Sequence, residues 1–204
     1  KNRGVQLQYG KSVGVNDLLA SLTYDKAKTY TRSYKRADKV WKTAIVERDS
    51  ILGFVQDKVH INDKWDLTPA IRYSHYGTFD NTSEDGSASS VNNSSSSTIT
   101  PTINTQYAFD DTMSAYFGWT KVYRPVKAGD LSLQDNKLWN GMKLEDEKGD
   151  VWTFGLRKDI SDKTSLAVHY DWTNMSNAVT SYSVMTKIVN NVPQYENRAV
   201  NAKE

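Results

Sequence analysis

Two polar residues at alternate positions near the end of the sequence, His169 and Asp171, are the first candidates for chemistry. In an extended strand, residues i and i+2 point to the same face, so the imidazole and the carboxylate would lie side by side. Such a pair can form a proton-linked site or bind a polar ligand. A second interpretation stays open: both residues belong to a water-exposed polar surface without a specific role.

The other reactive residue types form no known catalytic constellation. The three histidines, His60, His75 and His169, lack the spacing of metal ligands, and the chain has no cysteine. We therefore expect neither a metal site nor a cofactor. The acidic run 145–147 could serve acid–base catalysis, but a charged run in a loop is usually just solvated. No Ser-His-Asp arrangement, phosphate loop or dinucleotide motif occurs, so we expect a protein that is not an enzyme.

Composition narrows the class of protein further. The chain has 204 residues with 26 Lys and Arg against 24 Asp and Glu, and this near-balance argues against nucleic acid as a partner. A mean hydropathy of −0.67 is typical of a soluble protein. Strands of a membrane β-barrel, however, place only every second side chain in lipid. The 12 Tyr and 6 Trp outnumber the 5 Phe, as expected where rings meet a wet interface.

Strict alternation of apolar and polar residues is the strongest pattern in the chain. It runs through residues 65–75, 98–109, 112–120, 152–157 and 165–173, and it is weaker or mixed in 5–9, 18–24 and 51–60. Helical spacing fits none of these segments. The pattern predicts about eight antiparallel strands, each near the ~9–11 residues that a tilted strand needs to cross a bilayer.

The connections alternate as well. Short turns at 62–64, 110–111 and 161–163 separate long polar stretches at 77–96, 124–150 and from 174 to 182 or beyond. Membrane barrels have short periplasmic turns and long extracellular loops, whereas a soluble β-sandwich has no reason to place every long loop at one end. We therefore predict an all-β fold, an antiparallel transmembrane β-barrel.

This choice fixes the direction of the strands, with those starting near Trp65, Thr112 and Thr164 running outward. Two aromatic girdles follow from it. The outer girdle would contain Trp119, Tyr123, Trp152, Tyr170 and Trp172, and the inner one Trp65, Tyr107 and Phe109. Phe117, Phe154 and Val168 should face lipid, and Thr120, Thr153, Arg157, His169 and Asp171 should face the barrel interior.

Several stretches resemble TonB-dependent outer-membrane receptors. Residues 51–58 (ILGFVQDK) are similar to a family strand ending in aromatic-x-Gln-Asp-acidic, with Lys58 departing at the last place. Residues 65–76 (WDLTPAIRYSHY) resemble the next strand, with Ala70 in place of the usual Gly. Five further stretches resemble later strands of the family in the same order: 99–101, 115–125 (AYFGWTKVYRP), 144–145, 155–157 and 195–204.

The resemblance implies a large barrel of roughly 22 strands around a plug domain. We see about eight to nine strands and no plug, so we expect residues 1–204 to be a barrel section of a longer receptor. The family takes up scarce nutrients such as ferric siderophores, haem or cobalamin through the bacterial outer membrane. The implied partners are the lipid bilayer, the small-molecule nutrient, and the TonB complex acting through the plug.

The resemblance also suggests a ligand site where one strand leaves the membrane, at Tyr123-Arg124-Pro125. Haem-importing members carry a related motif followed by a His, and no His lies between Arg124 and Asp150 here. Arg124 could contact an anionic ligand such as a ferric siderophore, or it could lie at the lipid headgroups. We expect the loop 124–150 to contact ligand, with Tyr123, Arg124 and Trp139 as anchors.

Two other classes of protein remain open. The chain could be a complete small barrel of about eight strands that acts as an adhesin or a structural protein. A closing pair between its first and last strands would then be required. It could also be a soluble extracytoplasmic β-domain that binds glycans, which an apolar face without girdles would favour.

Overall fold

The computed structural model describes residues 1–35, 40–78, 80–83, 95–126 and 144–202. All regular secondary structure in these residues is β-strand. The described part of the chain contains no helix that is long and apolar enough to cross a membrane.

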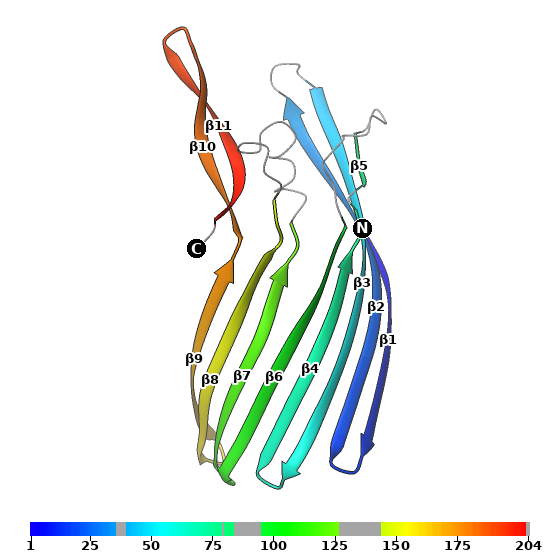
Figure 1. Cartoon of the computed structure of the whole chain (residues 1–204), viewed down its shortest axis with the longest axis vertical. Coiled ribbons are helices and arrows are strands. Elements are labelled where there is room, and N and C mark those ends of the chain that lie inside the picture. The colour runs from blue at the N-terminus through cyan, green and yellow to red at the C-terminus, as the bar shows by residue number, and fades with distance from the viewer. Residues whose placement is uncertain (36–39, 79, 84–94, 127–143, 203–204) are drawn as a thin grey trace.

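Eight strands follow one another in chain order across a single sheet, each antiparallel to the next (Figure 1). They are β1 (Asn2–Val13), β2 (Asn16–Lys35), β3 (Val40–Asn62), β4 (Trp65–Tyr76), β6 (Ser96–Asp110), β7 (Met113–Arg124), β8 (Glu147–Ser161) and β9 (Thr164–Ser176). The short β5 (Asp80–Ser83) pairs with β3. A separate hairpin consists of β10 (Ala178–Val189) and β11 (Val192–Ala202). The predicted all-β, antiparallel architecture is confirmed.

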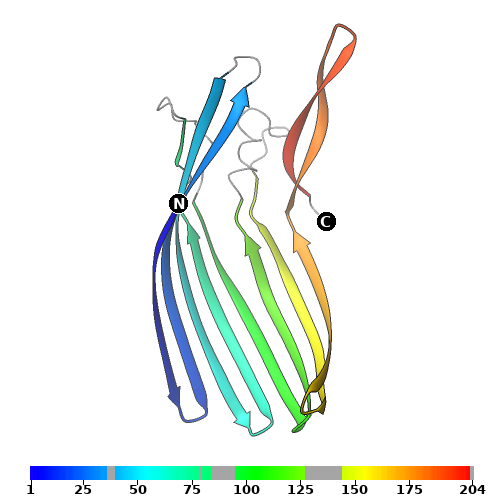
Figure 2. The ribbon, with the colours of Figure 1, turned by 180° about the vertical axis from the view of Figure 1, so that it is seen from behind.

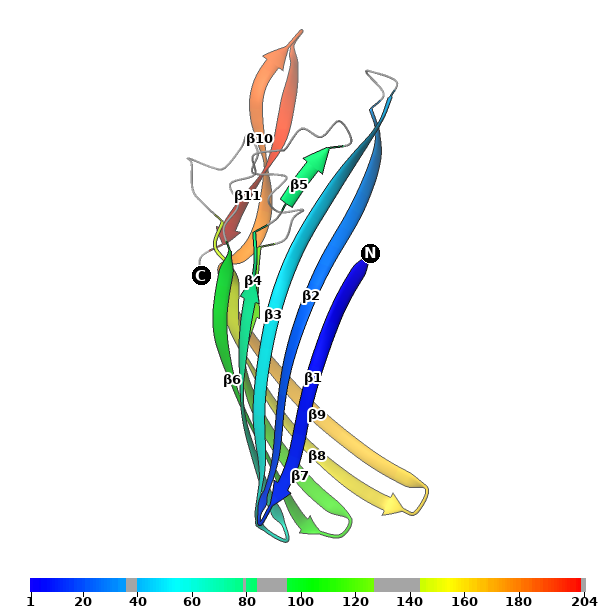
Figure 3. The same ribbon diagram turned by 90° about the vertical axis from the view of Figure 1, so that its right-hand side faces the viewer.

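The sheet is an open, curved wall. β1 and β9 form its two edges, on opposite sides of the view in Figure 2, and no pairing between them occurs among the described residues. Seen from the side, the strands curve and fan out toward the turn end (Figure 3). This is the shape expected of a section of a larger barrel, and it lacks the closing pair that a complete small barrel needs.

The register of the sheet places the predicted apolar side chains on one common face. Trp119 pairs with Trp152, and Trp152 pairs with Trp172. One row closer to the turns, Phe117, Phe154 and Tyr170 align in the same way. The rings make contact, with centroids 5.9 Å apart for Trp119 and Trp152. Alternation therefore sorts the side chains of neighbouring strands into one aromatic and aliphatic face and one polar face, as predicted.

The two faces differ in exposure. On the apolar face of β4 and β8, Tyr73 is 44% exposed and Phe154 is 50% exposed. On the polar face, Ser74 is 5% exposed, and Gly118 and Gly155 are buried. Side chains crowd together on the concave side of a curved sheet and spread on the convex side. The polar face is therefore the interior of the wall, and the apolar face is the outside.

The short turns gather at one end of the sheet, and the strand ends that lead into the longer connections, such as Tyr76 of β4 and Arg124 of β7, lie at the other (Figure 1). Trp65 pairs with Tyr107 next to the turns, and its indole nitrogen donates a hydrogen bond of 2.7 Å to the Thr105 hydroxyl. The row of Trp119, Trp152 and Trp172 lies nearer the loop end. The apolar face is thus bordered by aromatic side chains on both sides, as the predicted girdles require.

The predicted boundaries are wrong in three places. The stretch from 174 to 182 is not a loop, because β9 reaches Ser176 and β10 begins at Ala178. The left-handed Asn190 and Asn191 (φ 53° and 62°) then close the β10–β11 hairpin, as a two-residue turn requires. β2 and β3 have 20 and 23 residues, well beyond the predicted ~9–11, because they stay paired up to Lys35 and Val40. β5 lies inside the predicted loop 77–96.

Gly149 in β8 tests how closely this wall is packed. A Cβ atom there would lie 2.3 Å from the Asn174 carbonyl oxygen and 3.1 Å from the Met175 Cα, so the backbone of β9 would have to shift. We expect Gly149→Ala to destabilise the full-length barrel by about 1–3 kcal/mol in urea unfolding from vesicles. Gly10→Ala is the matched control, because its Cβ would meet nothing closer than 3.7 Å. Equal unfolding midpoints for the two variants would contradict the packing described.

Candidate ligand-binding site

A group of polar and aromatic side chains gathers at the loop end of β4, β6 and β7, beside the middle of β3. We name it the loop-end cluster, and it consists of Arg48, Tyr76, Ser96, Tyr123 and Asp146. Register brings the strand ends together, since Tyr76, the last residue of β4, pairs with both Ser50 of β3 and Ser96 of β6. Tyr123 is the penultimate residue of β7, and Asp146 directly precedes β8.

Asp146 holds the cluster together by accepting several hydrogen bonds. The Tyr123 hydroxyl donates to its Oδ2 atom at 2.7 Å, and the Val126 amide donates to Oδ1 at 2.9 Å. The Ser96 hydroxyl lies within hydrogen-bond distance of both Tyr123 and Asp146. Tyr123 lies four residues beyond Trp119 along β7, outside the aromatic row. Burial raises the pKa of its phenol to about 12; the Asp146 carboxylate adds to this rise, and the hydrogen bond with Ser96 opposes it. The phenol therefore stays neutral and acts as a donor.

Arg48 adds a positive charge to the aromatic rings. Its guanidinium lies 5.0 Å from the centre of the Tyr76 ring, which stacks on Tyr123 with centroids 6.2 Å apart. Its Nε donates to the Gly77 carbonyl at 2.9 Å, and its Nη1 donates to the Val126 carbonyl at 3.3 Å. A guanidinium held over a phenol ring can bind an anionic or planar ligand group. Sequence reasoning missed Arg48 because no motif surrounds it.

Arg124 is held by an acidic partner on the neighbouring strand. Arg124 pairs in register with Glu147 of β8, and its Nε and Nη2 atoms both contact the Glu147 carboxylate. Glu147 is only 7% exposed and also accepts a 2.6 Å hydrogen bond from the Val179 amide of β10. The expectation that the acidic run 145–147 is merely solvated is therefore wrong for Asp146 and Glu147.

His169 and Asp171 share the polar face, as predicted. Their Nε2 and Oδ2 atoms are 3.7 Å apart, and the Thr153 hydroxyl donates to Asp171 at 2.7 Å. Thr153, which pairs with Asp171, lies six residues along β8 from Glu147, or roughly 20 Å at about 3.3 Å per residue. The pair is therefore separate from the Arg124 site. Trp139, the third predicted anchor, lies outside the described residues.

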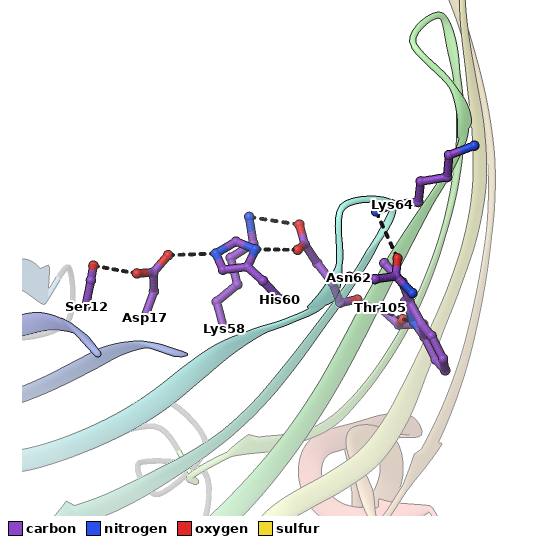
Figure 4. Close-up of polar contacts among 9 residues, drawn as sticks. Ser12, Asp17, Lys58, His60, Asn62, Lys64 and Thr105 are labelled. Carbon is purple, nitrogen blue, oxygen red and sulfur yellow. Dashed lines mark hydrogen bonds and ion pairs between the residues drawn. The ribbon is translucent and has the colours of Figure 1, made fainter. Parts of the chain in front are cut away.

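A second polar network lies at the turn end of β2, β3 and β4 (Figure 4). The His60 ring is flanked by two carboxylates, with 2.9 Å from Nε2 to Asp17 and 2.7 Å from Nδ1 to Asp66. Lys58 lies 3.0 Å from Asp66, and the Ser12 hydroxyl contacts Asp17. Sequence reasoning considered His60 only as a metal ligand, because its partners become neighbours only through strand pairing. In the described residues no group of three or more potential ligands could hold a metal ion.

An antiparallel wall with an aromatic-bordered apolar outside and a polar inside is the architecture of a transmembrane β-barrel. The comparison with known families agrees with this class. The model of the family described as TonB dependent receptor-like, beta-barrel matches residues 2–203, and the chain belongs to this family.

Solved structures of similar fold are much longer than this chain. The ferric citrate transporter FecA in its unliganded form is 17% identical, with a TM-score of 0.69 over 86% of this chain and 27% of its own length. The copper transporter OprC is 13% identical, with a TM-score of 0.70 over 98% of this chain and 33% of its own. The ferric-catecholate import receptor Fiu from K12 E. coli is 13% identical, with a TM-score of 0.62 over 97% of this chain and 33% of its own length. The chain thus spans about a quarter to a third of these proteins.

These identities are low, so the likeness to solved structures establishes a shared fold. A search of the curated proteins found no match to this chain. A functional proposal therefore rests on the family match and on the two faces of the wall.

Proposed function

We propose that this chain is part of a receptor in the bacterial outer membrane that takes up a scarce nutrient with energy supplied through TonB. The observation that carries the proposal is the family match over residues 2–203. The proteins of similar fold are a ferric citrate transporter, a copper transporter and a ferric-catecholate import receptor, which favours a metal ion or metal complex as the ligand. A ferric siderophore, haem and cobalamin are the candidates of this kind.

The described strands would form the wall of such a receptor. The apolar face contacts lipid, and the polar face lines the interior, where a plug domain from another part of the protein would sit. The TonB complex would act on that plug and not on the wall. The role of this section is then to hold the barrel open and to present its loop end to the ligand, without covalent chemistry.

The ligand would meet the protein at the loop end, where Tyr123 stacks on Tyr76 beside Arg48 and Arg124 follows Tyr123 at the end of β7. Two phenol rings and two guanidinium groups suit a bulky anionic complex. Glu147 fixes the orientation of the Arg124 guanidinium. Trp139, in the loop between β7 and β8, would add an apolar contact. Further inside the barrel, His169 and Asp171 would contact the nutrient as it passes.

Arg124→Ala should weaken binding of an anionic nutrient by on the order of tenfold, because a charge-assisted hydrogen bond contributes about 1.5–3 kcal/mol. The loss should be larger at low salt than at high salt. Arg157→Ala is the matched control, since Arg157 also lies on the polar face but at the turn end, beside Asp159. Direct binding to the purified full-length receptor, across a panel of ferric siderophores, haem and cobalamin, measures both variants. Equal affinity of both variants for the ligand of the wild type would remove Arg124 from the site.

Deleting residues 128–142 should leave membrane insertion intact, because loops tolerate changes of length at little cost. Uptake should fall or disappear if this loop contacts the ligand. Growth limited by one nutrient at a time, in a strain that lacks other receptors, measures uptake. A deletion variant that inserts normally and supports wild-type growth on every nutrient would show that the loop is not part of the site.

A further inference from the structure

A cluster of basic side chains lies on the outer face of the wall, near the loop end of β1 and beside the middle of β2 and β3. Figure 3 shows these three strands side by side. Arg3, Lys26, Lys28 and Glu47 line a pocket of about 340 Å³ together with Lys1 and Tyr30. We name it the basic pocket. Register assembles it, since Arg3 of β1 pairs with Lys26 of β2, and Lys28 pairs with Glu47 of β3.

The basic pocket belongs to the apolar face of the wall. Arg3 points to the same face of β1 as Val5 and Leu7, because residues two apart in a strand share a face. For the same reason, Lys26 points to the same face of β2 as Leu22 and Tyr24. Lys26 lies two residues beyond Tyr24, or roughly 7 Å at about 3.3 Å per residue. Tyr24 is as far along β2 from its turn as Trp172 is along β9, eight residues after each strand begins. The pocket therefore lies just beyond the aromatic border, at the level of lipid headgroups.

An apolar groove of about 460 Å³ lies on the same face, closer to the turns. Most of its lining is aliphatic or aromatic: Leu7, Tyr9, Ala20, Leu22, Gly53, Val55, Ile71, Tyr73 and Ile99. Leu7 of the groove is four residues from Arg3 of the basic pocket, or roughly 13 Å along β1. An apolar groove with a basic pocket above it matches the two ends of one amphiphile, with acyl chains below and an anionic headgroup above.

Positive charge is in excess in the basic pocket. Lys26 lies 3.3 Å from Glu47, Lys28 forms an ion pair with the same carboxylate, and Arg3 adds a third cation. Asp49, which pairs with Lys26 in the register, has its carboxylate next to Gly77, the residue that follows β4. The Lys26 side chain is 53% exposed and remains accessible. Even with Asp49 on the same face, two carboxylates do not neutralise three cations, so the pocket attracts anions.

We propose that the basic pocket and the groove bind a membrane lipid whose headgroup carries phosphate, in the leaflet at the loop end of the barrel. The inference rests on the proposed function, because it requires the apolar face to lie in a bilayer. Lys and Arg bind phosphate through charge-assisted hydrogen bonds, and the acyl chains cover apolar surface that the aromatic border leaves open. The bound lipid also ties β1 to the extended β2–β3 hairpin.

Native mass spectrometry of the full-length receptor tests this inference, with lipid A and its dephosphorylated form as probes. The triple variant Arg3→Gln, Lys26→Gln, Lys28→Gln should bind lipid A on the order of tenfold more weakly than the wild type. Arg3→Gln alone preserves both pairs with Glu47 and should show a smaller loss. The control Lys11→Gln, on the same face of β1 but near its turn, should bind lipid A like the wild type. Dephosphorylated lipid should bind every variant equally weakly.

The inference is overturned if the triple variant retains wild-type affinity for lipid A, or if the wild type does not distinguish the two lipids. Insertion of the wild-type receptor into vesicles is measured in parallel. A wild type that does not insert would overturn the proposed function together with this inference. A wild type that inserts and transports its nutrient but shows no preference for phosphate would overturn this inference alone.

Discussion

Replacing Phe154 or Val168 by arginine in the full-length receptor should lower the stability of the membrane-inserted protein by about 2–4 kcal/mol. Phe154 is 50% exposed and Val168 is 62% exposed on the apolar face. Both lie between the Trp152–Trp172 row and the turns, away from either border of the apolar band. A guanidinium there would have to leave water for hydrocarbon, because no acidic partner shares that part of the face.

The matched controls are Thr153→Arg and Ala167→Arg, one residue away on the same two strands. Both positions belong to the polar face, where Thr153 pairs with Asp171. The added charge would stay hydrated there, so the cost should be much smaller. Folding into lipid vesicles, followed by urea titration, gives all four free energies. Equal penalties on both faces would contradict the assignment of the apolar face to lipid.

Glu147→Ala should be the second most damaging change, at roughly 2–3 kcal/mol. Breaking a buried ion pair costs about 3–5 kcal/mol, and the partial exposure of Arg124 (32%) reduces that figure. The variant would leave the Arg124 guanidinium and the Val179 amide without this carboxylate. Because Val179 is the second residue of β10, hydrogen exchange of the β10–β11 hairpin should become faster along with the loss of stability.

Glu145→Ala provides the control for this prediction. Glu145 is exposed and accepts a 3.0 Å hydrogen bond from Asn177, so its removal should change stability by no more than about 0.5 kcal/mol. The double variant Arg124→Ala, Glu147→Ala should be less destabilised than the sum of the single variants. Strict additivity would mean that the ion pair contributes nothing to the wall.

The sequence predicts the wall well because alternation is a local property. In β7, β8 and β9 most large apolar residues fall on one face whichever strand lies beside them, so period two is visible without knowing the pairing. The aromatic row of Trp119, Trp152 and Trp172 follows from the same pattern. Short turns such as the one at Asp110 are equally local, since this carboxylate caps the turn by accepting from Thr112.

The parts that extend past the aromatic row at the loop end could not be predicted in this way. β10, β11 and the far half of the β2–β3 hairpin lie beyond the apolar face, so a regular alternation of apolar and polar residues is not required there. The same holds for contacts made by pairing across strands. His60 meets Asp17 and Asp66 only because β2, β3 and β4 are neighbours. Tyr123 and Arg124 were predicted through the family resemblance, whereas their partners Asp146 and Glu147 were mistaken for a solvated run.

Depth measurements along one strand test the central claim most directly, namely that one face of this wall contacts lipid and the other does not. The chain has no cysteine, so single cysteines can be placed at 167, 168, 169 and 170 of β9 and labelled with a fluorophore. In vesicles of brominated lipid, labels at Val168 and Tyr170 should be strongly quenched, and labels at Ala167 and His169 should not. Quenching that is uniform along the four positions, or strongest at Ala167 and His169, would contradict the account.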